Sequence, residues 1–130
     1  MVAIDTNIAV RLLVNDDPAQ TEKVVQLFNS NEVFIPKTVI LETEWVLRGV
    51  YQIDRRRTNA ALRALLSLER VVAEDESSLF AALDSHAEGM DFADALHLAS
   101  SQRADSLSTF DSSFITRAKE LSLLPPVTRL

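Results

Sequence analysis

The residues best suited to catalysis or metal binding are carboxylates that lie where strands are expected to end. Asp5 directly follows a short apolar run, residues 2–4. Glu42, Asp94 and Asp111 are each expected beside a strand end or a helix start, at the same edge of a sheet. In open α/β sheets, ligand chemistry collects outside the carboxyl ends of the strands. Because four carboxylates in one cleft are costly to desolvate without cations, this pattern indicates a divalent-metal enzyme.

The composition limits which metal such a site would hold. The chain has no cysteine and only two histidines, His86 and His97. Disulfides and thiolate zinc sites are therefore excluded, and an imidazole-rich site is not expected. The remaining ligand atoms are oxygens, which suit Mg²⁺, Mn²⁺ or Ca²⁺.

Each carboxylate also has a structural interpretation. Asp91 can cap a helix, Asp94 then resembles the acidic half of a capping box, and Asp111 can cap the helix that follows it. Asp94 is harder to explain by capping alone, because apolar residues follow it. We therefore assign Asp94 to the metal and give Asp91 a supporting or second-ligand place. Glu42 shares a helix side with Trp45, where a carboxylate is disfavoured unless it is paired.

Short strands and longer helices alternate along the chain. Strands are expected at residues 2–5, 33–35, 70–73 and 106–109 and near 127, and helices over 7–14, 18–29, 38–51, from 54, 75–86, 91–103 and 111–121. Strands separated by helices pair in parallel through right-handed crossovers. The expectation is one α/β domain over residues 1–130, a three-layer sandwich with a central, mainly parallel sheet flanked by helices.

The charge is unevenly distributed over the 130 residues. Residues 1–70 carry nine Lys/Arg and nine Asp/Glu, whereas residues 71–130 carry four and ten, which gives the whole net charge of −6. A polyanionic partner would bind to the arginines, and metal ions would neutralise the carboxylates. No leader sequence and no apolar run of about 20 residues is evident, so the default is a soluble cytoplasmic protein with no membrane span.

Four motifs in order resemble those of a known family. They are Asp-Thr-Asn after the first strand, Glu42 ahead of Trp-Val-Leu-Arg, Asp-Phe-Ala-Asp-Ala-Leu from Asp91, and Thr-Phe-Asp-Ser-Ser-Phe from Thr109. Over nearly the whole chain this resembles a PIN-domain ribonuclease and, more narrowly, the VapC-type toxins of toxin–antitoxin pairs. The resemblance implies a five-stranded parallel sheet, a homodimer and inhibition by a small DNA-binding antitoxin.

The same resemblance implies roles for particular residues. It makes Asp5, Glu42, Asp94 and Asp111 the acidic catalytic and metal-site residues, with Asp91 as a fifth, and makes Asn7 and Thr109 the residues that hold them in place. The hypothesis is that these carboxylates hold one or two Mg²⁺ or Mn²⁺ ions, which activate water for in-line attack on an RNA phosphodiester.

Other residues are assigned from the sequence with alternatives left open. Arg11 and Arg48 are candidates for phosphate contacts, whereas the run Arg55–Arg57 is better explained as a solvated helix face. One interpretation of His97, one turn after Asp94, is an imidazole that ligates metal or binds phosphate, but a partly buried helix histidine is favoured. Glu44 is expected to be solvated. Trp45 and Tyr51 are expected in the core. Surplus apolar residues are candidates for a dimer or antitoxin groove: Leu12, Leu13, Val24, Val25, Leu27 and Phe28.

Two other functions fit some of these features. One is a phosphatase-like or receiver-like domain in which Asp5 is a phosphorylated nucleophile, but such folds usually add a strand-end lysine, and Lys37 and Lys119 are poorly placed for that role. The other is a binding module whose acidic cleft holds a cation or a basic peptide. Cleavage of RNA that depends on Mn²⁺ separates the nuclease from both.

Overall fold

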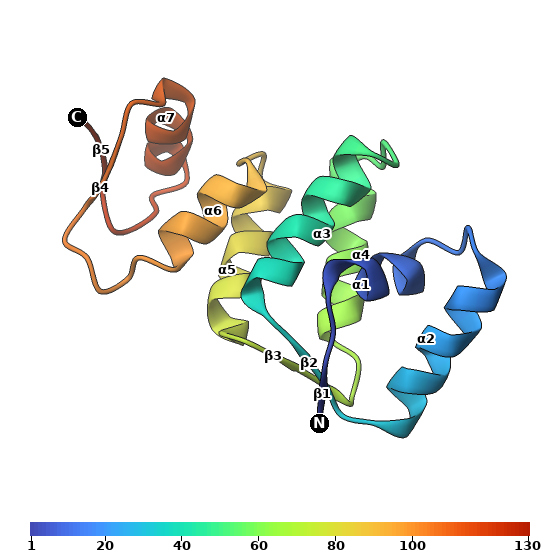
Figure 1. The fold of residues 1–130 in the computed structure, drawn as a ribbon. Coiled ribbons are helices and arrows are strands. Elements are labelled where there is room, and N and C mark those ends of the chain that lie inside the picture. Colours follow the sequence, from blue (N-terminus) through green and yellow to red (C-terminus); the bar gives the residue numbers. More distant parts are fainter. The chain divides into compact units, whose positions relative to one another are not determined.

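A computed structural model describes residues 1–130 as an α/β protein of five strands and seven helices (Figure 1). The strands are β1 (Val2–Ala3), β2 (Val33–Ile35), β3 (Val71–Ala73), β4 (Leu107–Thr109) and β5 (Val127–Arg129). The helices are α1 (Thr6–Leu13), α2 (Pro18–Ser30), α3 (Lys37–Gly49), α4 (Arg55–Leu66), α5 (Glu76–Ala87), α6 (Phe92–Ala99) and α7 (Ser112–Glu120). The chain divides into two compact units, Met1–Glu76 and Ser77–Leu130.

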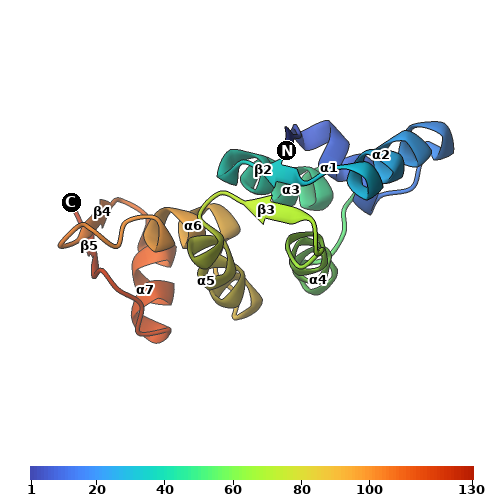
Figure 2. The ribbon, with the colours of Figure 1, turned by 90° about the horizontal axis from the view of Figure 1, so that it is seen from below.

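The first unit is built on a three-stranded parallel sheet in the order β1-β2-β3. Helices connect successive strands, as parallel pairing requires. Helix α3 packs against α1 and α4, and α4 packs on β3 (Figure 2). The core of this unit is aliphatic and includes Val33, Ile35, Ile40, Leu47 and Leu62, all fully buried.

Helix starts in the first unit are fixed by aspartates. The side chains of Asp5, Asp17 and Asp54 accept hydrogen bonds from backbone N–H groups of α1, α2 and α4. An N-cap of this kind satisfies donors that have no partner inside the helix and contributes about 1 kcal/mol. Asp5 caps α1, so the helix begins at Thr6, one residue before the expected start at residue 7.

The second unit pairs β4 with β5 in parallel, and α7 packs against both strands; the unit also contains α5 and α6. Gly89 separates α5 from α6 and adopts a φ of 105°, a conformation that favours glycine. Buried Phe92 packs against the ring of buried His86, with centroids 5.5 Å apart and the planes nearly perpendicular. Asp91 and Asp111 cap α6 and α7.

The alternation of strands and helices agrees with the expectation, and most boundaries fall within two residues of it. Helix α6 ends at Ala99 and not near residue 103; residues 100–103 form turns instead. The expected central sheet is present only in part: the strands form a three-stranded and a two-stranded parallel sheet.

The structure contains no helix that is both long enough and apolar enough to span a bilayer.

Three burial predictions are wrong, two of them on the same helix. Glu44 is 3% exposed and its carboxylate pairs with Arg48, 2.9 Å from Nε, whereas Trp45 is 57% exposed. The buried stripe of α3 runs through Val39, Ile40, Thr43, Glu44 and Leu47, a helical spacing that leaves Trp45 outside it. His97, expected to be partly buried, is exposed on α6.

Candidate active site

Two of the predicted site residues, Asp5 and Glu42, line one pocket in the first unit. The pocket has a volume of about 410 Å³, and its lining also includes Thr6, Asn7 and Tyr51. The Thr6 hydroxyl donates a hydrogen bond to Oε1 of Glu42, and Oδ1 of Asp5 accepts one from the backbone N–H of Ile8 at 3.1 Å. Each carboxylate therefore has one oxygen fixed by the fold and a second oxygen available to a ligand.

Thr6 is the residue here that the sequence interpretation overlooked. Asn7, which the family resemblance proposes as the supporting residue, is exposed in the first turn of α1 and shares the pocket. Its neighbour Thr6 makes the hydrogen bond that holds Glu42. A threonine immediately after a strand-end aspartate gives little signal by itself, because its partner lies 36 residues further along the chain.

Three further carboxylates belong to the second unit and lie at helix starts. Oδ2 of Asp91 accepts a hydrogen bond from the backbone N–H of Asp94 at 3.1 Å. Oδ1 of Asp111 accepts from the backbone N–H groups of Ser113 at 2.8 Å and Phe114 at 3.3 Å. Asp91 and Asp111 are therefore N-caps, as the structural interpretation of the sequence expected, and each still has a free carboxylate oxygen.

Asp94 occupies an unfavourable place for a negative charge. Partial burial is the main cause that raises the pKa of its carboxyl group, and the nearby charges of Asp91 and Asp111 raise it further, while His97 acts in the opposite direction. Burial and like charges both disfavour an ionised carboxylate. A cation bound beside Asp94 would relieve both effects, which makes this side chain a suitable metal ligand.

The turn that carries Asp111 is held from both sides. Thr109 Oγ1 accepts a hydrogen bond from the Asp111 backbone N–H at 3.1 Å. Arg129 pairs in register with Thr109 and donates from Nη1 to the carbonyl oxygen of Phe110 at 3.1 Å and from Nη2 to the Ser112 hydroxyl. Arg129 could not be selected from the sequence, because its role comes from strand pairing near the end of the chain.

The two predicted phosphate-binding arginines are both engaged within the first unit. Arg11 donates to Asp16 and Gln20, in each case at 2.6 Å, and Tyr51 donates to the other oxygen of Asp16 at 2.9 Å. Asp16 thereby links Arg11 to a residue of the pocket. Arg48 pairs with buried Glu44 while half of its side chain stays exposed. The run Arg55–Arg57 is fully on the exposed side of α4, as expected.

The donor set fits a divalent cation of the Mg²⁺ or Mn²⁺ type. Carboxylate oxygens are the ligands that such hard cations prefer. Asp5 and Glu42 each present one oxygen that no backbone or hydroxyl group uses, and so do Asp91 and Asp111. No group of three or more Asp, Glu, His or Cys side chains stands close enough together to hold a metal ion.

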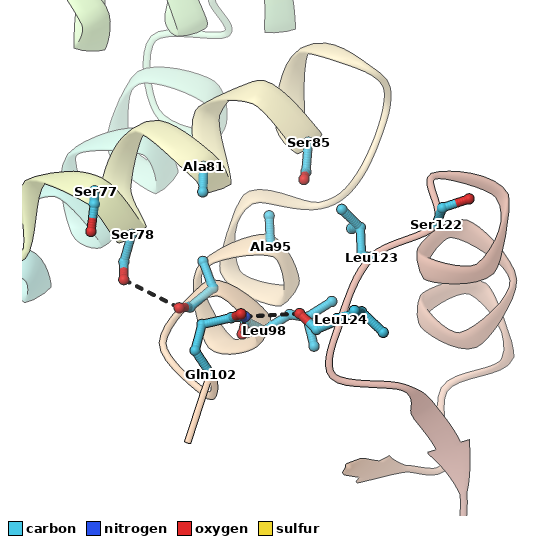
Figure 3. A pocket seen from close by; sticks show the side chains of 11 residues that line it. Ser77, Ser78, Ala81, Ser85, Ala95, Leu98, Gln102, Ser122, Leu123 and Leu124 are labelled. Carbon is cyan, nitrogen blue, oxygen red and sulfur yellow. Dashed lines mark hydrogen bonds between the residues drawn. The ribbon is translucent and has the colours of Figure 1, made fainter. Parts of the chain in front are cut away.

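A second pocket lies wholly within the second unit, among α5, α6 and the segment that follows α7 (Figure 3). It has a volume of about 420 Å³, and its lining mixes hydroxyls such as Ser77 and Ser85 with apolar Leu98 and Leu123. Gln102 donates to the carbonyl oxygen of Leu124 at 2.8 Å across it. No carboxylate lines this pocket, so it contains none of the candidate metal ligands.

The chain belongs to the PIN domain family, whose match covers residues 2–120 and therefore extends over both units. PIN domains are generally nucleases that depend on divalent metal ions, and PIN nucleases act on RNA. No curated protein matches the chain.

Proposed function

We propose that this protein is a metal-dependent endoribonuclease that hydrolyses phosphodiester bonds in RNA. The observation that carries the proposal is the pocket lined by Asp5 and Glu42, where each carboxylate is fixed through one oxygen and has the other free. Membership of the PIN family supports the same activity independently. We assign Asp5, Glu42, Asp94 and Asp111 as the catalytic metal-site carboxylates and Asp91 as an additional ligand.

This assignment treats residues 1–130 as one functional domain with one five-stranded sheet in the active enzyme. The family match across both units supports it.

The chain's own residues prepare the site for one or two Mg²⁺ or Mn²⁺ ions. Thr6 holds Glu42, while Thr109 and Arg129 hold the turn of Asp111, so the carboxylates need little reorganisation to bind. We assign Asn7 a supporting place beside Asp5, and Arg11 and Arg48 as contacts for the RNA phosphates. When bound, a divalent cation makes a water molecule more acidic and offsets the negative charge that develops on the phosphate.

We further propose that the protein is the toxin of a toxin–antitoxin pair, acting in the cytoplasm as a homodimer. An apolar groove of about 300 Å³ in the first unit supports a protein partner, because Leu12, Val25, Phe28 and Leu68 line it. Val25 and Leu68 are exposed, and exposed apolar side chains that cluster in a groove mark interaction sites. An amphipathic helix of the antitoxin is the segment that such a groove accommodates.

The experiment is incubation of the purified protein with structured and unstructured RNA in Mg²⁺, in Mn²⁺ or in EDTA, beside Asp5→Asn. Asparagine caps a helix as well as aspartate does, so this variant keeps α1 and removes a ligand charge. We expect metal-dependent cutting by the wild type and its loss in Asp5→Asn. RNA binding without cutting by a folded, antitoxin-free sample would instead identify a binding module, and full activity in Asp5→Asn would contradict the site.

A further inference from the structure

Trp45 is a large aromatic side chain that the folding of the first unit does not use. It is the only tryptophan of the chain, and it is 57% exposed on α3. A tryptophan normally buries most of its surface, and an exposed one is typical of a binding surface.

The indole lies with one face against the helix. A Cβ atom built on Gly49 would lie 3.7 Å from Cε2 of the ring and 3.9 Å from both Cδ2 and Cζ2. Near-equal distances to an atom and its two ring neighbours place that point over the face of the six-membered ring and not at its edge. Gly49, which carries no side chain, therefore leaves the ring resting on the helix, while its other face is open to a ligand.

This ring adjoins the acidic pocket. Trp45 follows Glu42 by three residues, so the two side chains share a side of α3 at a rise of about 4.5 Å along its axis. Val50, which is 61% exposed, caps the C-terminal end of α3 and lines the pocket of Asp5 and Glu42. Arg48, three residues after Trp45, carries a guanidinium that pairs with buried Glu44 through Nε, and half of its side chain is exposed. An aromatic face, a cation and a carboxylate pocket thus occur together on one stretch of helix.

We propose that Trp45 stacks on an unpaired base of the RNA, adjacent to the phosphodiester bond held at the acidic pocket. This inference rests on the proposed function and adds a base-binding residue to the proposed site. Every base has a face that can stack on an aromatic ring, and stacking of this kind tolerates sequence differences. Bases within a duplex are already stacked and paired, which is why proteins read splayed-out bases in loops and single strands.

The test uses the fluorescence of Trp45, which is the only tryptophan signal of the protein. The full chain carrying Asp5→Asn is titrated in Mg²⁺ with a single-stranded oligoribonucleotide, with the duplex of the same sequence, and with inorganic polyphosphate, which has no bases. We expect the single strand to quench the fluorescence and the duplex and polyphosphate to leave it nearly unchanged. Binding of the single strand, followed by its anisotropy, without any change in tryptophan fluorescence would overturn the proposal.

Three variants separate stacking from other roles of this surface. Trp45→Leu keeps an apolar side chain without an aromatic face and should weaken single-strand binding about tenfold, whereas Trp45→Phe should retain most of it. Val72→Ala, at an exposed apolar residue of β3, is the matched control and should bind as the wild type does.

Equal binding by Trp45→Leu and Trp45→Phe would overturn stacking even if both variants cut RNA. Fluorescence that changes with protein concentration and not with RNA would assign the ring to contact with a second copy, which also overturns it. Failure of the wild type to cut any RNA would instead count against the nuclease, because the binding titration does not depend on cleavage.

Discussion

The two acidic clusters differ in how much of the fold depends on them. In the second unit, Asp91 and Asp111 are helix caps, so their carboxylates are already needed for α6 and α7. In the first unit, Glu42 lies within α3, is exposed, and makes its hydrogen bond through a side chain and not through a helix end. Its position is explained by the pocket and not by local helix stability.

This difference separates loss of chemistry from loss of structure. Replacing a capping aspartate by alanine, Asp5 of the first unit included, affects stability and any ligand role together, so such a variant is ambiguous. Replacing Glu42 should change the chemistry of the pocket and leave the stability of the fold unchanged. Glu42 is therefore the position where a catalytic role can be tested without a change in folding.

The largest effect is expected for Glu42→Gln. The amide keeps the shape of the side chain and removes a charged ligand oxygen. Because loss of an outer-shell residue alone costs 10- to 100-fold, we expect RNA cleavage to fall by more than about 100-fold, with no change in Tm. Cleavage rates and thermal unfolding measured on the same sample check this, with Glu22→Gln on the exposed side of α2 as the control. Wild-type activity in Glu42→Gln would remove this residue from the site.

A smaller effect is expected for Thr6→Val, which removes the hydroxyl that donates to Glu42 but keeps the side-chain shape. We expect activity to fall about tenfold and the Mn²⁺ concentration for half-maximal activity to rise, as for other residues that orient metal ligands. Thr6→Ser retains the hydroxyl and should stay near wild type. Equal losses in both variants would show that the methyl group, and not the hydrogen bond, is what matters.

Asp91 should reveal its capping role through stability. Asp91→Ala removes the hydrogen bond to the Asp94 backbone N–H and should lower the free energy of unfolding by about 1 kcal/mol, whereas Asp91→Asn should leave it nearly unchanged. Denaturant unfolding of the metal-free proteins measures both. If Asp91→Asn is stable but cuts RNA more slowly, Asp91 is also a ligand. If it is stable and fully active, Asp91 is only a cap.

The smallest effect is expected for Asp94→Asn in the absence of metal. Burial, with Asp91 and Asp111, raises the pKa of the Asp94 carboxyl group, so the folded state holds this proton more tightly than the unfolded state does. Stability then falls as the pH rises from the ordinary aspartate pKa through the raised value, and it stays lower above it. Asparagine does not titrate, so we expect Tm to rise by about 2 °C at pH 7.

That gain in Tm should disappear near pH 3, where aspartate is protonated in both states. Thermal unfolding at the two pH values measures it, and Asp105→Asn, at an exposed residue of the same unit, should change nothing. An Asp94→Asn variant that loses stability at pH 7 would contradict the unfavourable environment assigned to this carboxylate.

The sequence predicted the elements well because their signals are local. Proline at the first turn of α2 and aspartates before α4 and α7 mark helix starts directly. The sequence did not predict which side of α3 is buried, because Trp45, Val46 and Val50 are apolar but lie outside the buried stripe. Glu44 is buried within that stripe, where Arg48, one turn later, compensates its charge.

The candidate site was predictable in its acidic residues and not in the groups that hold them. An aspartate after a strand has a recognisable position, so Asp5 and Asp111 could be selected from the sequence. The bond from Thr6 to Glu42 and the bonds from Arg129 around Asp111 join residues far apart in the chain. Such pairs depend on tertiary packing, about which one sequence gives little information.

The central claim is the proposed function's assignment of Glu42 and Asp94 as ligands of the catalytic metal. Mn²⁺ binding by the wild type, Glu42→Gln, Asp94→Asn and the double variant, followed by calorimetry, tests it most directly. We expect either single variant to weaken Mn²⁺ binding at least tenfold, and the double variant to lose less than the two single losses added together, because the effects of ligands of one ion are not additive. Unchanged Mn²⁺ affinity in either single variant would contradict the assignment of that residue as a ligand.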